Sequence, residues 1–353
     1  MLTISRVDLV AVLQAMKDTV TKTVENPLCL VVIENGRAYA TNYDEWRFRD
    51  VETQCAGRVL LPVHEVLKGV KALRGDVVEL DTEVTETSRQ TTVWDPHLKA
   101  MAPITVVDKS ARTTIRCGTF KLDLKNLPVF DVELPTPWDV EARLFFTAET
   151  LGAILHRTCY CMSTDETRPS LNGAFLRFES DALTIVATDG HRFAVTRQDV
   201  EGPETPHDMI VGMKGVWEIE RVVKANKKAV AWLALESKTV TPDKTPANPN
   251  PKPWKTYRLR VTVGPDEVLT HGLDESYTDY TRVIPKRCPV RVDCAVSDLE
   301  AGMDAMRPWL DPKTRIVRFT VLPSALQLNV SNPNGREVTD EVVAVVSGLP
   351  EPR

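Results

Sequence analysis

Residues 187–195 read ATDGHRFAV, and the alternating run LTIVA at 183–187 leads into them. Branched residues at every second position are typical of a strand. Asp189 and Gly190 predict a tight turn, because glycine adopts a positive φ without steric cost. The residues after the turn predict a second strand. We therefore expect a hairpin with His191 and Arg192 at a sheet rim, where their polar groups can reach a partner.

Length and composition indicate a soluble globular protein. The chain has 353 residues, of which 42% are hydrophobic and 26% are charged, and this length predicts two or three domains. No apolar run approaches the roughly 20 residues that span a bilayer. The N-terminus lacks the layout of a signal peptide. We therefore expect a cytoplasmic protein without membrane association.

The cysteines favour neither disulfides nor a metal site. There are seven of them, scattered along the chain, and an odd, scattered set does not predict a disulfide framework. The segment Cys159-Tyr160-Cys161 lacks the C-x-x-C spacing of zinc ligands. We expect no metal and no cofactor.

The net charge limits how the protein can meet nucleic acid. It is −5 at pH 7, whereas a protein that grips nucleic acid over its whole surface is strongly basic. An acidic exterior around a basic channel has the same overall charge and limits non-specific binding. DNA contact on one inner face is therefore compatible with the composition.

One supersecondary unit recurs along the chain: a short strand, an amphipathic helix, then several strands. Five such units are expected, two in each of the first two domains. Their first strands are predicted at 2–4, 58–61, 143–146, 209–211 and 290–294. The predicted helix starts are Ser5 as a cap, Pro62, Thr147 as a cap, a start near Gly215, and Ser297 as a cap with Glu300 three residues on. The apolar side of the first helix is predicted to hold Val7, Val10, Leu13 and Met16. A hairpin turn is predicted at Asn35 and Gly36.

Pairing the units divides the chain into domains at 1–139, 140–286 and 287–353. Proline-rich junctions at 134–137 and 284–286 support these boundaries. Two excursions interrupt the units, at 83–115 and at 236–255. The second is rich in proline and lies between two predicted strands, which favours an exposed hairpin extension.

The motif LNG at 171–173, followed by ATDGHR and by AV at 194–195, resembles the central-domain signature of the bacterial DNA polymerase III beta subunit family, the sliding clamps. The resemblance covers the whole chain and is strongest over 143–195 and 275–286. It implies an α+β DNA-clamp fold of repeated strand-helix-strands units, with helices lining a ring and antiparallel sheets outside.

The resemblance also implies a function without catalysis. Clamps of this family are homodimers that close head to tail around double-stranded DNA as processivity factors. They tether the replicative DNA polymerase, the clamp loader and other DNA-handling proteins through short peptide motifs. A clamp of this family has six units, and here the sequence ends after the fifth. We therefore expect a partial third domain, weak peptide binding, and a monomer or a loose oligomer.

Three sets of residues correspond to functional positions of the family. A hydrophobic peptide-binding pocket would consist of Arg168, Leu171, Thr188, Gly190, His191, Arg192, Phe193 and Val283. The DNA-facing residues would be Lys17, Lys22, Lys68, Lys71, Arg74, Arg157, Lys214, Arg221 and Lys224. The dimer interface would contain Phe120, Leu122 and Trp309. In the alternative interpretation Leu171, Val283 and Trp309 are core residues, and several of the cations are merely solvated.

Two other functions remain open at this point. The chain could be a divergent or truncated clamp relative that binds a partner protein without encircling DNA. It could also be an enzyme that uses Asp189 and His191 for acid–base chemistry. However, no nucleophile with a plausible third partner is apparent beside them. We therefore predict no catalytic residues.

Overall fold

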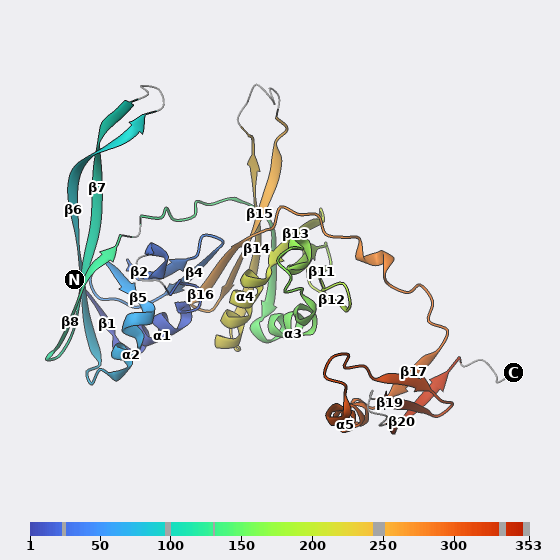
Figure 1. Ribbon diagram of the computed structural model, residues 1–353. Coiled ribbons are helices and arrows are strands. Elements are labelled where there is room, and N and C mark those ends of the chain that lie inside the picture. The colour runs from blue at the N-terminus through green and yellow to red at the C-terminus, as the bar shows by residue number, and fades with distance from the viewer. Residues whose placement is uncertain (23–25, 96–99, 130, 243–250, 332–336, 349–353) are drawn as a thin grey trace. The chain divides into compact units, whose positions relative to one another are not determined.

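The computed structural model describes residues 1–22, 26–95, 100–129, 131–242, 251–331 and 337–348, with side chains omitted at 93–104. These residues form two compact units, Met1–Thr278 and Asp279–Arg353 (Figure 1). None of the described helices is long and apolar enough to cross a membrane.

Among the described residues, the first half of the larger unit contains two α-helices, one 3-10 helix and eight strands. In chain order the elements are β1 (Leu2–Ser5), α1 (Arg6–Met16), η1 (Pro27–Cys29), β2 (Leu30–Glu34), β3 (Arg37–Thr41), β4 (Glu45–Asp50), β5 (Arg58–Pro62), α2 (Val63–Ala72), β6 (Val77–Asp95), β7 (Ala100–Cys117) and β8 (Phe120–Pro128).

The second half repeats this plan. Its elements are β9 (Asp139–Thr147), α3 (Ala148–Thr158), η2 (Cys159–Cys161), η3 (Pro169–Leu171), β10 (Gly173–Phe178), β11 (Ala182–Thr188), β12 (Phe193–Asp199), β13 (His207–Gly212), α4 (Met213–Ala225), β14 (Val230–Val240), β15 (Trp254–Val263) and β16 (Asp266–His271).

A single eight-stranded antiparallel sheet joins the two halves, in the order β5-β2-β3-β4-β16-β15-β14-β9. The junction is the β4–β16 pair, where Trp46 lies opposite Leu269. Four-stranded sheets flank it, in the orders β1-β6-β7-β8 and β12-β11-β10-β13. Each half has its own apolar core, although Leu269 of β16 belongs to the first. The division at residue 139 remains a prediction.

Local sequence signals explain several element boundaries. The Ser5 hydroxyl accepts the backbone N–H of Asp8 at 3.0 Å, which caps α1. The Thr147 hydroxyl accepts the N–H of Thr150 at 3.0 Å and caps α3. Asn35 and Gly36 have φ values of 51° and 76°, as a type I′ hairpin turn requires. These three predictions are confirmed.

The predicted apolar face of α1 was partly wrong. Val7 is 67% exposed, and the buried residues of the helix are Leu9, Val12, Leu13 and Met16. The four buried residues share one face at helical spacing, and Val7, two residues before Leu9, lies on the opposite side of the helix.

Both predicted excursions are parts of long hairpins. Strands β6 and β7 pair from Glu79 and Arg116 to Asp95 and Ala100. Strands β14 and β15 pair from Ala231 and Val263 to Val240 and Trp254. Figure 1 shows both hairpins extending beyond their sheets. The tip of the proline-rich segment, residues 243–250, lies outside the described residues.

The smaller unit contains η4 (Tyr280–Arg282), β17 (Arg291–Cys294), α5 (Val296–Met306), η5 (Arg307–Trp309), β18 (Arg318–Val321), β19 (Ala325–Ser331) and β20 (Glu337–Ser347). Its sheet has the order β17-β20-β19-β18. The core beneath α5 consists of Met306, Leu328, Val330 and Val342.

Two details of this unit differ from the sequence-based expectation. Ser297 does not cap α5, because the helix begins at Val296 after Ala295, and the Ser297 hydroxyl lies 3.1 Å from the Asp298 carboxylate. Strand β20 was not expected at all. The run VVAVV at 342–346, rich in β-branched residues, is the sequence signal that could have predicted it.

Candidate functional site

The tip of the β11–β12 hairpin is held by Asp189. One carboxylate oxygen accepts the backbone N–H groups of His191 and Arg192, each at 2.9 Å, and the other accepts the Arg192 Nε at 2.8 Å. The hydrogen bonds from the Arg192 and His191 backbones hold the pKa of Asp189 well below its usual range. Asp189 is therefore a charged structural group at neutral pH, which does not suit it to proton transfer.

The predicted turn is a four-residue loop between the paired residues Thr188 and Phe193. The Thr188 hydroxyl donates to the Arg192 carbonyl at 2.7 Å and accepts the Gly190 N–H at 3.0 Å. Gly190 has a φ of 89°, so the expectation of a glycine-dependent turn is confirmed. These bonds fix the direction in which the loop side chains leave the sheet.

Arg168 comes close to this loop from a distant part of the sequence. A Cβ built on Gly190 would lie 3.5 Å from the Arg168 guanidinium. Arg168 also pairs with Asp165 at 3.5 Å. The structure therefore brings Arg168, Gly190 and Arg192 together, and it places Leu171 and Phe193, both half-buried, on η3 and β12.

Tyr160 belongs to the same surface and was not among the predicted site residues. The Arg192 guanidinium carbon lies 5.7 Å from the centroid of the Tyr160 ring, within the range of a cation–π contact. Tyr160 is exposed between the buried Cys159 and Cys161. The sequence shows a tyrosine between two cysteines. Only the geometry of η2 shows that the cysteines are buried and that the tyrosine ring is exposed.

Val283, the remaining predicted pocket residue, lies in the smaller unit. It follows η4 and is 65% exposed there, so it is not a core residue of that unit. Its participation in a pocket with the hairpin tip remains a prediction.

The predicted DNA-facing residues are exposed cations on or beside four helices. Helix α1 packs against α2, and α3 packs against α4 (Figure 1). Lys17 and Lys22 follow α1, Lys68 and Lys71 lie on α2 with Arg74 after it, Arg157 lies on α3, and Lys214 and Lys224 lie on α4.

Arg221 differs from the other predicted DNA-facing residues, because acidic side chains already neutralise it. Its guanidinium lies 2.5 Å from Glu218 and 3.7 Å from Asp18. Burial raises the pKa of Glu218. The pair with Asp18 connects α4 to the end of α1, so Arg221 joins the two helix pairs.

The predicted interface residues are partly exposed. Phe120 is 42% exposed and begins β8, an edge strand of its sheet in the described part of the chain. Leu122 lies two residues on and is half-buried. Trp309, in η5 of the smaller unit, is 43% exposed and lies outside the apolar core of that unit. The alternative interpretation of Trp309 as a core residue is therefore wrong.

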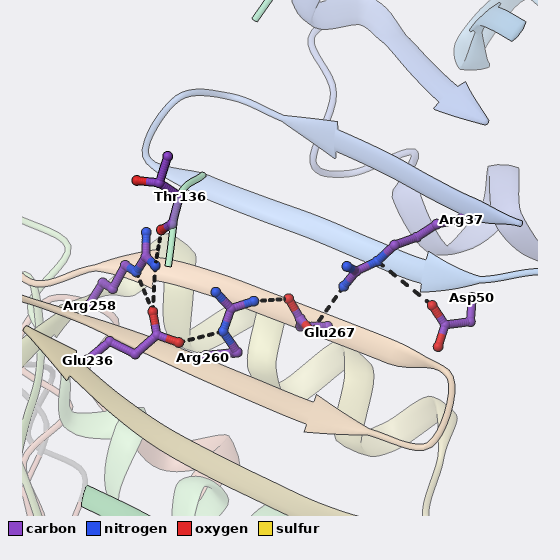
Figure 2. Close-up of polar contacts among 7 residues, drawn as sticks. All are labelled: Arg37, Asp50, Thr136, Glu236, Arg258, Arg260 and Glu267. Carbon is purple, nitrogen blue, oxygen red and sulfur yellow. Dashed lines mark hydrogen bonds and ion pairs between the residues drawn. The ribbon is translucent and has the colours of Figure 1, made fainter. Parts of the chain in front are cut away.

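A chain of ion pairs ties the two halves of the larger unit across the sheet (Figure 2). Glu236 accepts from Arg258 and from Arg260, each at 2.6 Å. Arg260 pairs with Glu267, and Glu267 lies 3.0 Å from Arg37 of β3. This chain of pairs therefore passes from the second half of the unit into the first.

Arg258 extends this network to the proline-rich junction. Its side chain is 2% exposed and donates to the carbonyl of Thr136 at 2.6 Å. A second cluster surrounds the buried Asp266, whose carboxylate accepts from Arg47, Arg49 and Asn226 at 2.8–2.9 Å. Buried pairs whose partners come from both halves resist relative movement, because separating them leaves uncompensated charge.

Comparison with known proteins connects this architecture to a family. The family model described as "DNA polymerase III beta subunit, central domain" matches residues 146–244. The beta sliding clamp of Proteus mirabilis is 28% identical over 245 residues, or 69% of this chain and 61% of that clamp. This chain is similar to the bacterial beta sliding clamps. The chain matches about three-fifths of the length of that curated clamp.

Solved clamp structures share the fold. The DNA polymerase III subunit beta of Pseudomonas aeruginosa aligns with a TM-score of 0.76 at 21% identity, covering 99% of this chain and 85% of that one. A sliding clamp of Bartonella birtlesii, bound to griselimycin, aligns with a TM-score of 0.73 at 21% identity and the same coverage. The expected α+β clamp fold is therefore confirmed.

Among the residues that the structure describes, no group of three or more His, Cys, Asp or Glu is arranged to hold a metal ion. Cys159 is free, and burial raises its pKa to about 12, which makes it a poor thiolate ligand at neutral pH.

Proposed function

We propose that this chain acts as a DNA sliding clamp, a processivity factor that encircles double-stranded DNA and tethers a replicative polymerase. The observation that carries the proposal is the clamp fold, which aligns over 99% of this chain with a DNA polymerase III beta subunit. In this function the protein acts by topology, without catalysis, cofactor or metal, in the cytoplasm.

The four helices of the larger unit are the proposed DNA-facing surface. Sliding requires several weak contacts with phosphates and no reading of bases. The exposed cations on or beside α1 to α4 are spread over two helix pairs. Such a distribution suits a moving duplex better than one concentrated basic patch.

The hairpin tip is the proposed site for partner peptides of the polymerase and the clamp loader. The set is Arg168, Leu171, Thr188, Gly190, His191, Arg192, Phe193 and Val283. Arg168 and Arg192 are exposed cations beside the tip, and they suit a peptide's carboxylates and carbonyl groups. Leu171 and Phe193 offer apolar surface for its Leu or Phe.

Ring closure is proposed to use the β8 edge and the surface around Trp309 of a second copy. An edge strand presents unpaired backbone groups that a partner can use, and Phe120 and Leu122 lie on it. In this proposal the chain divides into three clamp domains at 1–139, 140–286 and 287–353. We expect the association to be loose and concentration-dependent.

Fluorescence anisotropy with a labelled 30-base-pair duplex tests the DNA surface. The chain should bind weakly, and the binding should fall steeply as salt is added. The double change Lys68→Glu and Lys71→Glu should reduce the affinity about tenfold or more, since two phosphate contacts become repulsive. The matched control Lys313→Glu and Arg318→Glu changes the same charge in the smaller unit and should have little effect. An equal loss of DNA affinity in both variants would contradict the assignment of the four helices as the DNA-facing surface.

One observation favours a second function, in which the chain binds a partner protein without encircling DNA. Helix α5 carries Asp298, Glu300 and Asp304, whereas α2 and α4 carry exposed lysines. An acidic helix is a poor wall for a DNA channel. In that case a peptide would bind at the hairpin tip while the duplex would show no salt-dependent binding.

A further inference from the structure

A cleft in the larger unit lies at the N-terminal end of α4. Asp44 and Glu45 reach it from the start of β4, and Glu166 reaches it from the segment before η3. Met213 and Lys214 begin α4, and His271 ends β16. Side chains from both halves of the unit therefore line one cavity, and none of them belongs to the proposed peptide site.

Glu45 is the deepest ionisable group of this cleft. Its backbone is fixed, because its N–H donates to Asn42 at 2.8 Å and its carbonyl accepts from the Thr41 hydroxyl at 2.8 Å. The residue is only 4% exposed. Its Oε2 atom is buried without a hydrogen-bond partner among the residues that the structure describes.

A buried carboxylate oxygen without a donor is unfavourable. Taking such a group out of water without a compensating bond costs on the order of 1–3 kcal/mol in mutational studies. Burial raises the pKa of Glu45, and Asp44 and Glu218 add to this rise. The Asn42 side chain and the charge of Lys214 oppose this rise without reversing it. The cleft therefore presents one carboxylate oxygen, Oε2, that lacks a hydrogen-bonding partner in the described part of the chain.

The charges around Glu45 favour a positively charged ligand. Asp44 and Glu166 add two carboxylates, and Lys214 is the only lysine or arginine lining the described cleft. Burial and the nearby Arg258 lower the pKa of His271, so that this ring is neutral at pH 7. The N-terminal end of α4 would attract an anion, but its Met213 N–H already donates to the Asn172 carbonyl at 3.1 Å.

We propose that this cleft binds the guanidinium group of an arginine side chain carried by a partner polypeptide, with the Glu45 carboxylate as the buried acceptor. A guanidinium is planar and weakly hydrated, and it donates two parallel N–H bonds to a carboxylate. These properties suit a desolvated carboxylate better than those of a compact, strongly hydrated ammonium group. The proposal does not depend on the function as a sliding clamp.

Methyl NMR on the full chain tests this proposal directly. Met213 lines the cleft, so a chain labelled at its methionine methyl groups carries a reporter there, which a Met213→Leu variant would assign. Met306 in the core of the smaller unit serves as the internal control. The probes are Nα-acetyl-arginine amide, the lysine analogue, and the citrulline analogue, which is neutral but has nearly the same shape.

The arginine probe should shift the Met213 signal saturably, with a dissociation constant of about 1 mM, as befits a single side chain. The lysine probe should bind several-fold more weakly, and the citrulline probe should cause no saturable shift. The Met306 signal should not move with any probe. An equal response to arginine and citrulline would overturn the proposal, since charge would then play no part.

Two variants locate the binding group. Glu45→Gln should weaken the arginine response about tenfold or more, because it removes the acceptor charge. Glu166→Gln, an exposed change that does not threaten folding, should weaken it several-fold. The matched control Glu204→Gln lies on an exposed loop outside the cleft and should bind as the unaltered chain does. If Glu45→Gln and Glu166→Gln bound the arginine probe as tightly as Glu204→Gln, the proposal would be wrong.

Discussion

At the scale of single residues, the candidate site depends on Asp189 more than the sequence indicated. The ATDGHR run suggested either a partner-binding rim or acid–base chemistry by Asp189 and His191. In the structure the Asp189 carboxylate accepts two backbone N–H groups and the Arg192 side chain. The sequence predicts a turn here, but it does not show which side chain accepts hydrogen bonds from the backbone N–H groups of the loop.

Replacing Asp189 by Ala should release Arg192 and loosen the hairpin tip. A fluorescent peptide with a Gln and a Leu/Phe end should then bind several-fold more weakly, while the melting temperature should change little, because the residue is at the surface. The control Asp181→Ala removes an ion pair to Arg197 and should leave peptide binding unchanged. Peptide binding that survives Asp189→Ala would place the peptide site elsewhere.

Replacing Glu45 by Gln should stabilise the chain at neutral pH. Because the pKa of Glu45 is raised in the folded state, the folded protein holds this proton more tightly than the unfolded chain does. The free energy of unfolding therefore falls as pH rises from the unfolded value toward the raised one. Glutamine carries no charge, so the variant does not lose stability in this way. Its free energy of unfolding should exceed that of the unaltered chain by about 1 kcal/mol at pH 7.5, and by less near pH 4.5.

Thermal unfolding at both pH values checks this prediction. Glu204→Gln, an exposed carboxylate, is the control and should be neutral. A Glu45→Gln variant less stable than the unaltered chain at pH 7.5 would show that the carboxylate has a partner in solution.

At the scale of elements, the sequence predicted caps and turns, which depend on adjacent residues, better than it predicted which strands pair. The caps Ser5 and Thr147 and the turn at Asn35 and Gly36 each depend on a few adjacent residues, and all three were predicted. The predicted cap at Ser297 was wrong although serine is a suitable residue, because α5 begins one residue earlier, at Val296. Strand β20 was missed although its valine-rich run is a local signal, and no local pattern specifies its pairing with β17 and β19.

Replacement of two helical glycines by alanine should change the stability of the chain in opposite directions. A Cβ on Gly215 of α4 would lie 2.3 Å from the Thr270 Oγ1 atom of β16, whereas a Cβ on Gly69 of α2 would meet nothing within 4 Å. Gly215→Ala should destabilise the chain by about 1–3 kcal/mol through overpacking. Gly69→Ala should stabilise it by roughly 0.5–1 kcal/mol, because alanine has the higher helix propensity. Urea unfolding of both variants measures the difference, and destabilisation of equal size would contradict the close packing of α4 on β16.

At the scale of the whole molecule, the sequence predicted the repeated units and the clamp fold through a resemblance. It did not predict the network that joins the two halves. The contacts of Glu267 with Arg260 and Arg37 depend on how β15 and β16 align with β3 and β4. These two pairs of strands are far apart in the chain. Peptide partners, ring closure and the role of Val283 likewise depend on contacts beyond one chain or one unit, so they remain proposals.

The central claim is that the protein encircles DNA, and a threading experiment tests it most directly. A ring can pass over the free end of a linear duplex, so the chain is first mixed with a duplex biotinylated at both ends. Streptavidin then blocks the ends, and salt is raised to remove contacts with phosphates. We predict that the protein leaves the blocked duplex more slowly than a duplex with one end free, because a loosely associated ring can leave the blocked duplex only by opening. Equal loss from both would contradict encirclement.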